Sequence, residues 1–458
     1  MNWVLLAITL YVLAQFAVGV YVSRKMASDT DYILAGRQLG LGLVVFSVFA
    51  TFFGAEAIIA SAGNIHENGL RGGLVDPFGY AAALVIVGVY FAARLRNKNL
   101  VTFADFFKTR YSDRVEKLVV LVLLPGSLFW GAAQIRSFGQ VIGAQSGISL
   151  TAAITIAALL VMAYSIVGGL MADAVTDFLQ GIVLIIGLLV LFFVISTLKQ
   201  DGFQGLAGVS AERLTFFGSD DGPIKKIEKL SIAICGTIVA VELISRFLGA
   251  QTGAIAARGT IIGGILYLII GLIPLYIGLV GPQLAPNLKE AEQIVPTIAE
   301  TFLPTAAFVI FIGALISAIL SVVHATLHAP AAQVAQNLLG SVVPNSAPKK
   351  RLWLVRLTVA ALSVVAFALA LTSDTIKELV ETASAFGSAG VFIVTMFGLF
   401  TRFGGERAAF ATILTGVLVW AAARYVFTVE TPYLIGLFCS LATYVAVARL
   451  SEPKLSTR

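Results

Sequence analysis

Ionisable residues are rare in the long apolar stretches of this sequence, and five of them lie inside such a stretch or at its edge: Glu56, Arg136, Asp177, Glu242 and Arg246. A charge within a membrane-spanning segment costs a few kcal/mol or more, so each is expected to meet a solute, an ion or an opposite charge. No nucleophile and base accompany them at helical spacing. The chemistry they predict is binding and transport, and not intramembrane catalysis.

Glu56 and Arg136 lie at similar depths in their segments, so the two side chains could meet. They could form a buried pair that fixes one segment against the other. Alternatively they could face a solute, with Trp130 and Gln134 on the turn beside Arg136 supplying an aromatic wall and an amide. If both charges take part, a zwitterionic or carboxylated small molecule would suit them.

Three further groups of ionisable residues could have either a structural or a functional role. Glu242 and Arg246 have the i to i+4 spacing of a helical pair, for which a structural role is favoured. Asp177 comes near the start of its segment, where a carboxylate also gains from a helix N-terminus, so structural and functional roles stand equal. His324 and His328 are expected near a membrane surface and less as proton carriers.

A polar stripe follows one helical face, because Ser317, Ser321, His324 and His328 are spaced by four, three and four residues. Hydroxyls and backbone carbonyls suit a dehydrated monovalent cation. The serines could instead bond back to the carbonyl four residues earlier and pack closely.

Composition places these residues in a polytopic membrane protein. The chain has 458 residues, 58% of them hydrophobic and 12% charged, with a mean hydropathy of +0.94. A soluble domain carries about 25% charged residues. No basic run exceeds Lys349, Lys350 and Arg351, which argues against nucleic acid. The sequence has no Walker A loop, HExxH or CxxC, which argues against ATP as an energy source and against a zinc enzyme.

Apolar segments of spanning length predict an all-α protein with about thirteen transmembrane helices. The segments are 3–22, 39–62, 74–93, 118–145, 150–170, 175–198, 230–250, 259–284, 301–328, 352–372, 380–401, 405–427 and 431–449. Lys and Arg concentrate in the loops that would be cytoplasmic if the N-terminus lies outside and the C-terminus inside. A multi-pass protein of the cell inner membrane, embedded in the lipid bilayer, is therefore expected.

Two segments contain candidate interruptions. In the second segment, Gly54 and Glu56 interrupt an otherwise apolar helix. In the seventh segment, Gly236 and Thr237 interrupt the apolar run in a similar way. The two segments are five apart and run in opposite directions, as the leading helices of two inverted repeats would. Each glycine could also merely permit close packing.

Several short motifs, in this order and spacing, resemble the sodium:solute symporters, which share the LeuT-type inverted-repeat fold. They are Ile33-Leu34-Ala35-Gly36-Arg37, Ala50-Thr51, Val101-Thr102-Phe103-Ala104-Asp105-Phe106 with Arg110-Tyr111, Gly168-Gly169-Leu170 with Thr176-Asp177-Phe178-Leu179-Gln180, Arg246-Phe247-Leu248 and Gly398-Leu399-Phe400. The tract 129–133 is similar to the choline-transporting branch of the family, and the identity of the solute stays undetermined.

The resemblance implies a 5+5 core with one extra N-terminal and two extra C-terminal helices. Its divisions would be an N-terminal helix and loop over 1–38, a first repeat over 39–198, an extracellular loop over 199–229, a second repeat over 230–402, and C-terminal helices and tail over 403–458.

The resemblance also implies a sodium site. Its ligands would be the backbone carbonyls of Ala50, Phe53 and Ala318 and the hydroxyl of Ser321. The family usually has a second hydroxyl at the next position, where this chain has Val322, and the loss should weaken or remove sodium binding. Asp177 matches a carboxylate on the ion's inward path, and His324 replaces an acidic or small polar residue there.

These observations predict a secondary active transporter that imports a small polar organic solute by alternating access, most simply with Na⁺. The solute would lie between the second, fourth, seventh and ninth segments, against Glu56, Trp130, Gln134, Arg136, Gly236 and Thr237. A proton-coupled or uncoupled transporter, in which Asp177 and His324 replace the lost hydroxyl, is the alternative. A transporter-like sensor is a third reading.

Overall fold

The computed structural model describes residues 3–23, 28–198, 202–216, 222–288, 290–340, 348–373 and 376–451. These residues form helices, turns and one isolated β-bridge. The α-helices are α1 (Trp3–Ser23), α2 (Asp29–Leu34), α3 (Leu41–Phe52), α4 (Ser61–Asn68), α5 (Tyr80–Ile86), α6 (Ala93–Arg96), α7 (Ala104–Arg110), α8 (Asp113–Ser146), α9 (Leu150–Val167), α10 (Leu170–Ser196), α11 (Pro223–Ile238), α12 (Val241–Leu248), α13 (Gly253–Leu284), α14 (Ile294–Phe302), α15 (Thr305–Gln333), α16 (Pro348–Thr372), α17 (Ile376–Ala385), α18 (Ser388–Phe400), α19 (Glu406–Ala421) and α20 (Pro432–Ser451).

Ten helices in the described ranges are long and apolar enough to cross a membrane, which confirms an all-α polytopic protein. Nine of them each overlap one predicted segment, and the first, Glu56–Arg96, covers the third segment and the end of the second. The three other predicted segments, 3–22, 39–62 and 380–401, fall on α1, on α3 with the turns after it, and on α17 with α18. The total of thirteen crossings stays a prediction.

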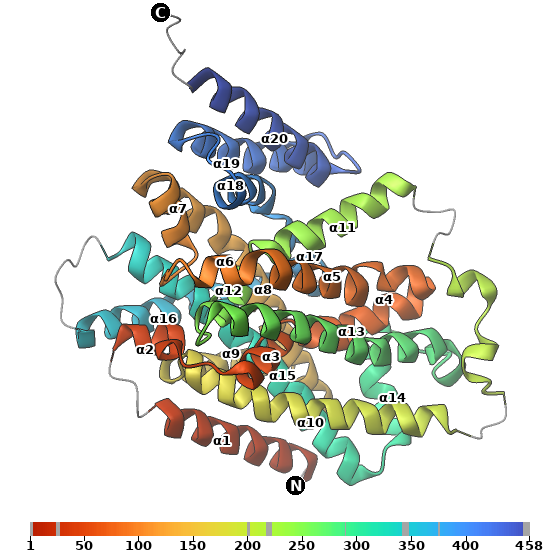
Figure 1. Cartoon of the computed structure of the whole chain (residues 1–458). Helices are drawn as coiled ribbons and strands as arrows, with labels where there is room; N and C mark the ends of the chain where they lie inside the picture. The colour runs from red at the N-terminus through yellow and green to blue at the C-terminus, as the bar shows by residue number, and fades with distance from the viewer. Residues whose placement is uncertain are drawn as a thin grey trace, which may run out of the picture.

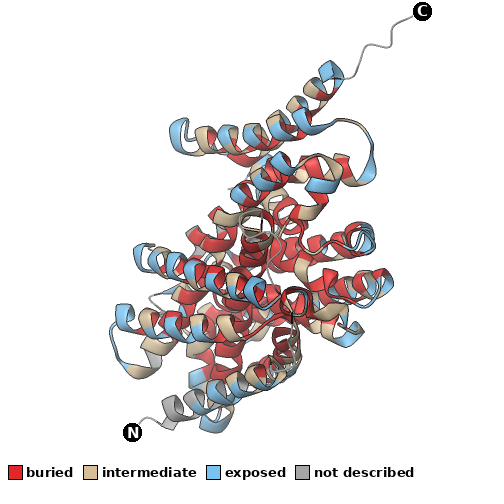
Figure 2. Cartoon of the chain, turned by 90° about the vertical axis from the view of Figure 1, so that its left-hand side faces the viewer, coloured by how far each residue is buried: buried red, intermediate tan, exposed pale blue. Residues whose placement is uncertain are grey.

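The long helices lie side by side around a buried centre. In Figure 1, α10 and α13 run roughly parallel across the view, with α1 at one edge and α18 to α20 at the other. Figure 2 shows buried residues gathered along the middle and exposed ones on the outer helix faces. At the centre, α13 packs on α3, and α15 packs on α8 and α10.

Two helices near this centre are interrupted. The first stops at Phe52, passes through Phe53 with φ −90° and ψ 61°, and becomes helical again at Glu56. The second stops at Ile238, and extended Ala240, with φ −64° and ψ 115°, precedes α12. Interruption at Gly54 is thus confirmed.

The second interruption lies beyond the predicted glycine, because Gly236 is still inside α11. A Cβ atom at Gly236 would come within 2.7 Å of the Ser384 carbonyl oxygen. This glycine therefore lets the backbone of α17 approach α11, and the helix unwinds only at Val239 and Ala240.

Backbone hydrogen bonds join the start of the first interrupted helix to the end of the second. The Leu39 amide donates to the Gly249 carbonyl over 3.1 Å, and the Gln251 amide donates to the Leu39 carbonyl over 3.0 Å. The start of α3 therefore lies beside the end of α12. The two interrupted helices run in opposite directions, as predicted.

Candidate functional site

A cavity of about 60 Å³ lies between the two interruptions. Its lining comes from the ends of α3, α11 and α12 at the breaks, and from α5, α8, α17 and α18. The lining residues are Phe52, Glu56, Tyr80, Leu123, Gly126, Ser127, Trp130, Gly236, Thr237, Val239, Ala240, Val241, Glu242, Ala383, Ser384, Phe386 and Ser388. We call this the central cavity.

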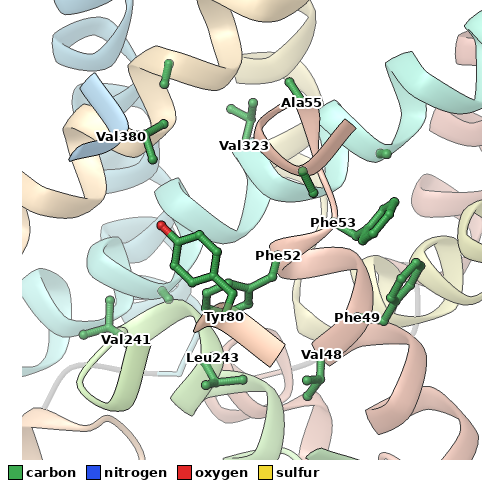
Figure 3. Close-up of a cluster of buried hydrophobic side chains, with 14 of the residues drawn as sticks. Val48, Phe49, Phe52, Phe53, Ala55, Tyr80, Val241, Leu243, Val323 and Val380 are labelled. Carbon is green, nitrogen blue, oxygen red and sulfur yellow. The ribbon is translucent and has the colours of Figure 1, made fainter. Parts of the chain in front are cut away.

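Aromatic rings form one wall of the central cavity. The Phe52 ring lies 5.2 Å from that of Trp130 and 6.1 Å from that of Tyr80, measured between centroids. Figure 3 shows Phe52 and Tyr80 close together beside the interruption at Phe53, with Val241 of α12 nearby. Aromatic faces carry negative charge density and attract cations, most strongly where water is excluded.

Two carboxylates face the same cavity. The Glu56 side chain lies close to the Tyr80 hydroxyl, which is 3.5 Å from the Ser384 hydroxyl. The Glu242 side chain lies close to Ser127, and its Oε1 atom has no hydrogen-bond partner although only 3% of the residue is exposed. Among the described residues that line the cavity there is no lysine, arginine or histidine. The cavity is therefore electronegative.

The structure brings together four of the six predicted solute ligands, namely Glu56, Trp130, Gly236 and Thr237. Gln134 lies behind the break, where its Oε1 accepts a hydrogen bond from the Ala55 amide over 3.2 Å. Arg136 lines another cavity, together with Glu67, Glu290 and Glu292, and donates to the Ala370 carbonyl over 3.2 Å. Glu56 and Arg136 thus face different cavities.

Sequence reasoning missed part of this lining. Tyr80 comes from the third predicted segment and Phe386 follows α17, and neither stands out as a polar residue in an apolar helix. α15, the ninth predicted segment, contributes no lining residue. Glu242 was assigned to a pair with Arg246, although a carboxylate two residues after an unwound stretch is a signal for a site.

The predicted sodium ligands belong to the first interrupted helix and to α15, and α15 passes beside the interruption at Val322. α3 ends at Phe52, so the last carbonyls of this helix, that of Ala50 included, lie at or beyond the end of its hydrogen-bond ladder. A Cβ atom at Gly54 would come within 2.6 Å of Val322 Cγ2. The side chain of Val322 therefore fills the space beside the unwound backbone and presents a methyl group to it.

Asp177 links the same two helices. Its Oδ2 atom accepts a hydrogen bond from Ser47 on α3 over 2.8 Å, and its Oδ1 atom accepts one from Ser321 on α15. The predicted position near a helix start is wrong, because α10 begins at Leu170 and Asp177 lies two turns further on. The carboxylate is held by hydroxyls and not by a helix N-terminus.

Asp173, which sequence reasoning missed, occupies the first turn of α10 and organises a buried ionic cluster. It forms an ion pair with Arg246, and its Oδ2 atom lies 3.0 Å from Nδ1 of His324. Arg246 Nε also donates to the Thr51 hydroxyl over 2.8 Å. The expected pairing of Arg246 with Glu242 is thus replaced by a contact between helices.

Both histidines of the stripe are buried inside the protein. Their rings stack at 5.1 Å, and Nε2 of His328 lies 3.0 Å from the Tyr32 carbonyl oxygen. Ser317 donates to the Gly313 carbonyl over 2.9 Å, so this hydroxyl bonds back along its own helix.

Two further cavities share lining residues with the central cavity. A cavity of about 520 Å³, which we call the vestibule, shares Glu56, Tyr80 and Ser384 with it. A small cavity near Thr102 and His328 shares Val241 with it.

Comparison with known proteins gives a consistent result. The sequence pattern of the Sodium:solute symporter family matches residues 32–416. High affinity choline transporter 1 of Homo sapiens is 24% identical over 440 residues, which cover 91% of this chain and 76% of that protein. The Sodium/pantothenate symporter of Escherichia coli (strain K12) is 26% identical over 356 residues, 75% of this chain and 73% of that protein. A solved structure of a Na+-coupled sialic acid symporter in a substrate-bound outward-open state has a TM-score of 0.85 at 18% identity, over 98% of both chains. This last similarity is one of fold.

Proposed function

Because the chain belongs to the sodium:solute symporter family and is a secondary active transporter, we propose that it imports a small organic cation together with sodium. The observation that carries this proposal is the lining of the central cavity. Glu56 and Glu242 face it together with the rings of Phe52, Tyr80 and Trp130. An ammonium group satisfies both features, since it pairs with carboxylates and stacks on aromatic faces.

A zwitterion or a carboxylated solute has less support. Its carboxylate would need a cationic partner, and Arg136, the predicted one, lines a different cavity. Relatives that are named choline transporters favour a cation, whereas pantothenate, named for another relative, carries a carboxylate. The electronegative lining of the central cavity supports the cationic solute.

For sodium, the proposed ligands are the carbonyls of Ala50, Phe53 and Ala318 and the hydroxyl of Ser321. Unwound backbone beside a second helix is the usual setting for such an ion. Val322 leaves one position apolar, so the expected sodium affinity is low. Asp177, which bonds Ser321, would help the ion leave on the opposite side from the vestibule.

We further propose that the vestibule opens to the outside of the cell inner membrane. Arg94, Arg96, Lys108, Arg110 and Arg114 lie in the segment between two spanning helices at the other end of the bundle. Loops rich in Lys and Arg stay in the cytoplasm. This orientation puts the N-terminus outside and directs solute inward.

Uptake into proteoliposomes tests the proposal. We expect saturable uptake of radiolabelled choline, used as a probe cation, that accelerates under an inward sodium gradient. Pantothenate serves as the anionic control and should neither enter nor compete. Saturable, sodium-driven uptake of pantothenate with no interaction with choline or tetramethylammonium would overturn the cation assignment.

Proton coupling is the second candidate, favoured by the methyl group of Val322 at the ion site and by the buried contact between His324 and Asp173. In the same vesicles an inward proton gradient at constant sodium would then accelerate uptake, and sodium would have no effect. Saturable stimulation by sodium at constant pH would exclude this candidate.

A further inference from the structure

A second carboxylate site lies at the floor of the vestibule, apart from both the central cavity and the sodium ligands. Asp76 lines the vestibule and is 6% exposed. Its Oδ1 atom accepts a hydrogen bond from the Tyr267 hydroxyl over 2.8 Å, whereas its Oδ2 atom has no partner. A buried carboxylate with an unused oxygen is costly unless something pairs with it.

Arg71, Lys229 and Arg424 also line the vestibule, but none of them is paired with Asp76. Within the described ranges, no lysine, arginine or histidine forms an ion pair with it. The groups that act on it are the surrounding apolar atoms and the Tyr267 hydroxyl. Among the described residues no positive charge is paired with Oδ2, and a bound cation would supply one.

Two other carboxylates that line the vestibule are already satisfied. Glu430 pairs with Lys225 at 3.0 Å. Glu228 accepts hydrogen bonds from the amides of Tyr433 and Leu434, each over 2.7 Å, and so caps α20. Asp76 differs from both because its Oδ2 atom is buried without a hydrogen-bond partner.

Packing fixes the position of Asp76. The Ser61 hydroxyl donates to its main-chain carbonyl over 2.8 Å. The next residue, Pro77, packs so closely on α13 that a Cβ atom at Gly271 would come within 2.6 Å of it. One turn earlier on α13, Tyr267 bonds Asp76, and its ring lies 5.3 Å from that of Phe53 in the interruption.

The site also adjoins the route to the central cavity. Tyr80 and Tyr267 both lie within electrostatic reach of Asp76 and of Glu56. Glu56 belongs to the lining of both cavities. A cation that leaves Asp76 toward the centre of the molecule therefore meets a second carboxylate.

We propose that Asp76 is an outer binding site for a monovalent cationic group, which occupies the vestibule floor before the central cavity is reached. Na⁺ and the ammonium group of a solute share the required chemistry, a single positive charge that a buried carboxylate oxygen can pair with. The site does not depend on the sodium ligands at the interruption or on the solute class of the central cavity.

Protection of Asp76 from carbodiimide tests this on the unaltered protein. Dicyclohexylcarbodiimide modifies buried carboxyl groups, and mass spectrometry of the peptide that contains Asp76 reads its modification alone. We expect saturating Na⁺ or tetramethylammonium to slow this modification at least fivefold. If Na⁺ alone protects, the site is assigned to sodium. If tetramethylammonium alone protects, the site is assigned to the ammonium group of the solute. Absence of protection by either cation would overturn the proposal.

A variant provides the second measurement. Asp76→Asn keeps the side-chain shape and an oxygen that can accept the Tyr267 hydrogen bond. Glu430→Gln is the control, because it removes a vestibule carboxylate that is already paired with Lys225. In equilibrium binding of ²²Na⁺ and of labelled tetramethylammonium, Asp76→Asn should lose one bound cation per chain or weaken its binding at least tenfold, with no such change in Glu430→Gln. Identical isotherms for wild type and a folded Asp76→Asn would contradict the site.

Discussion

Replacement of Val322 by threonine should strengthen sodium binding. The two side chains have the same shape, so Val322→Thr exchanges one methyl for a hydroxyl in a residue that is completely buried. The Val322 side chain already reaches the interrupted backbone, as the 2.6 Å separation of its Cγ2 atom from a Cβ built at Gly54 shows. A hydroxyl there would face the carbonyls that are proposed to hold the ion.

The size of the effect follows from the energy of one polar group beside a charge. A neutral hydrogen-bonding group contributes about 1.5 kcal/mol to a charged partner in a protein. That corresponds to roughly tenfold in affinity. Without the ion, a buried hydroxyl would cost about 1–3 kcal/mol. Bonding to the Ala318 carbonyl, four residues earlier, would offset much of that cost.

Sodium dependence of uptake in proteoliposomes measures the change. We expect the sodium concentration for half-maximal uptake to fall about tenfold in Val322→Thr, and sodium to raise its melting temperature more than that of wild type. Val323→Thr is the matched control, because Val323 is equally buried and follows directly in α15. A folded Val322→Thr whose sodium dependence stays within twofold of wild type would refute the proposed ligand set.

Three further predictions address the solute and the ionic cluster. Glu56→Gln should weaken binding of a cationic solute about thirtyfold or more, since loss of a buried charge partner costs about 2 kcal/mol or more; normal KM in a choline competition assay would instead indicate a structural role. Trp130→Leu should raise the solute KM about five- to thirtyfold, in line with about 1–2 kcal/mol for a desolvated cation–π contact, and an unchanged KM would remove this ring from the site. Asp173→Asn should lower the free energy of unfolding by about 3–5 kcal/mol, because it leaves Arg246 buried without its counterion; thermal unfolding in detergent should show partial recovery in the double variant with Arg246→Gln, and equal stability of Asp173→Asn and wild type would contradict the ion pair.

Hydropathy predicted the helices well because the bilayer imposes a minimum apolar length on each crossing. The interruption at Gly54 was also predictable, since a glycine and a carboxylate in an otherwise apolar helix have few structural uses. Gly236 shows the limit of that reasoning. A glycine that unwinds a helix and one that admits a neighbouring backbone have the same sequence signature, and only the position of Ser384 distinguishes them.

Charge partners were harder to predict than helices. Spacing along one helix suggested that Glu242 pairs with Arg246, whereas Arg246 pairs with Asp173 on another helix. Asp173 escaped attention because hydropathy starts the sixth crossing at residue 175, and α10 begins at Leu170. The predicted helix start was thus about one turn too late, and it placed Asp173, the central carboxylate of the buried cluster, in a loop.

A group of buried polar contacts surrounds the half of α3 that precedes the interruption. There α3 is joined to α10 and α15 through Ser47, Asp177 and Ser321, and to α12 through Thr51 and Arg246. The proposed sodium ligands come from α3 and α15, the same two helices that Asp177 links. An ion between them would hold α3 against α15 and keep that interface closed, and its departure would leave only the hydroxyl contacts of Asp177. We infer that sodium and the buried cluster stabilise the same closed interface, so that the solute, once seated between the two interruptions, leaves only after both have loosened.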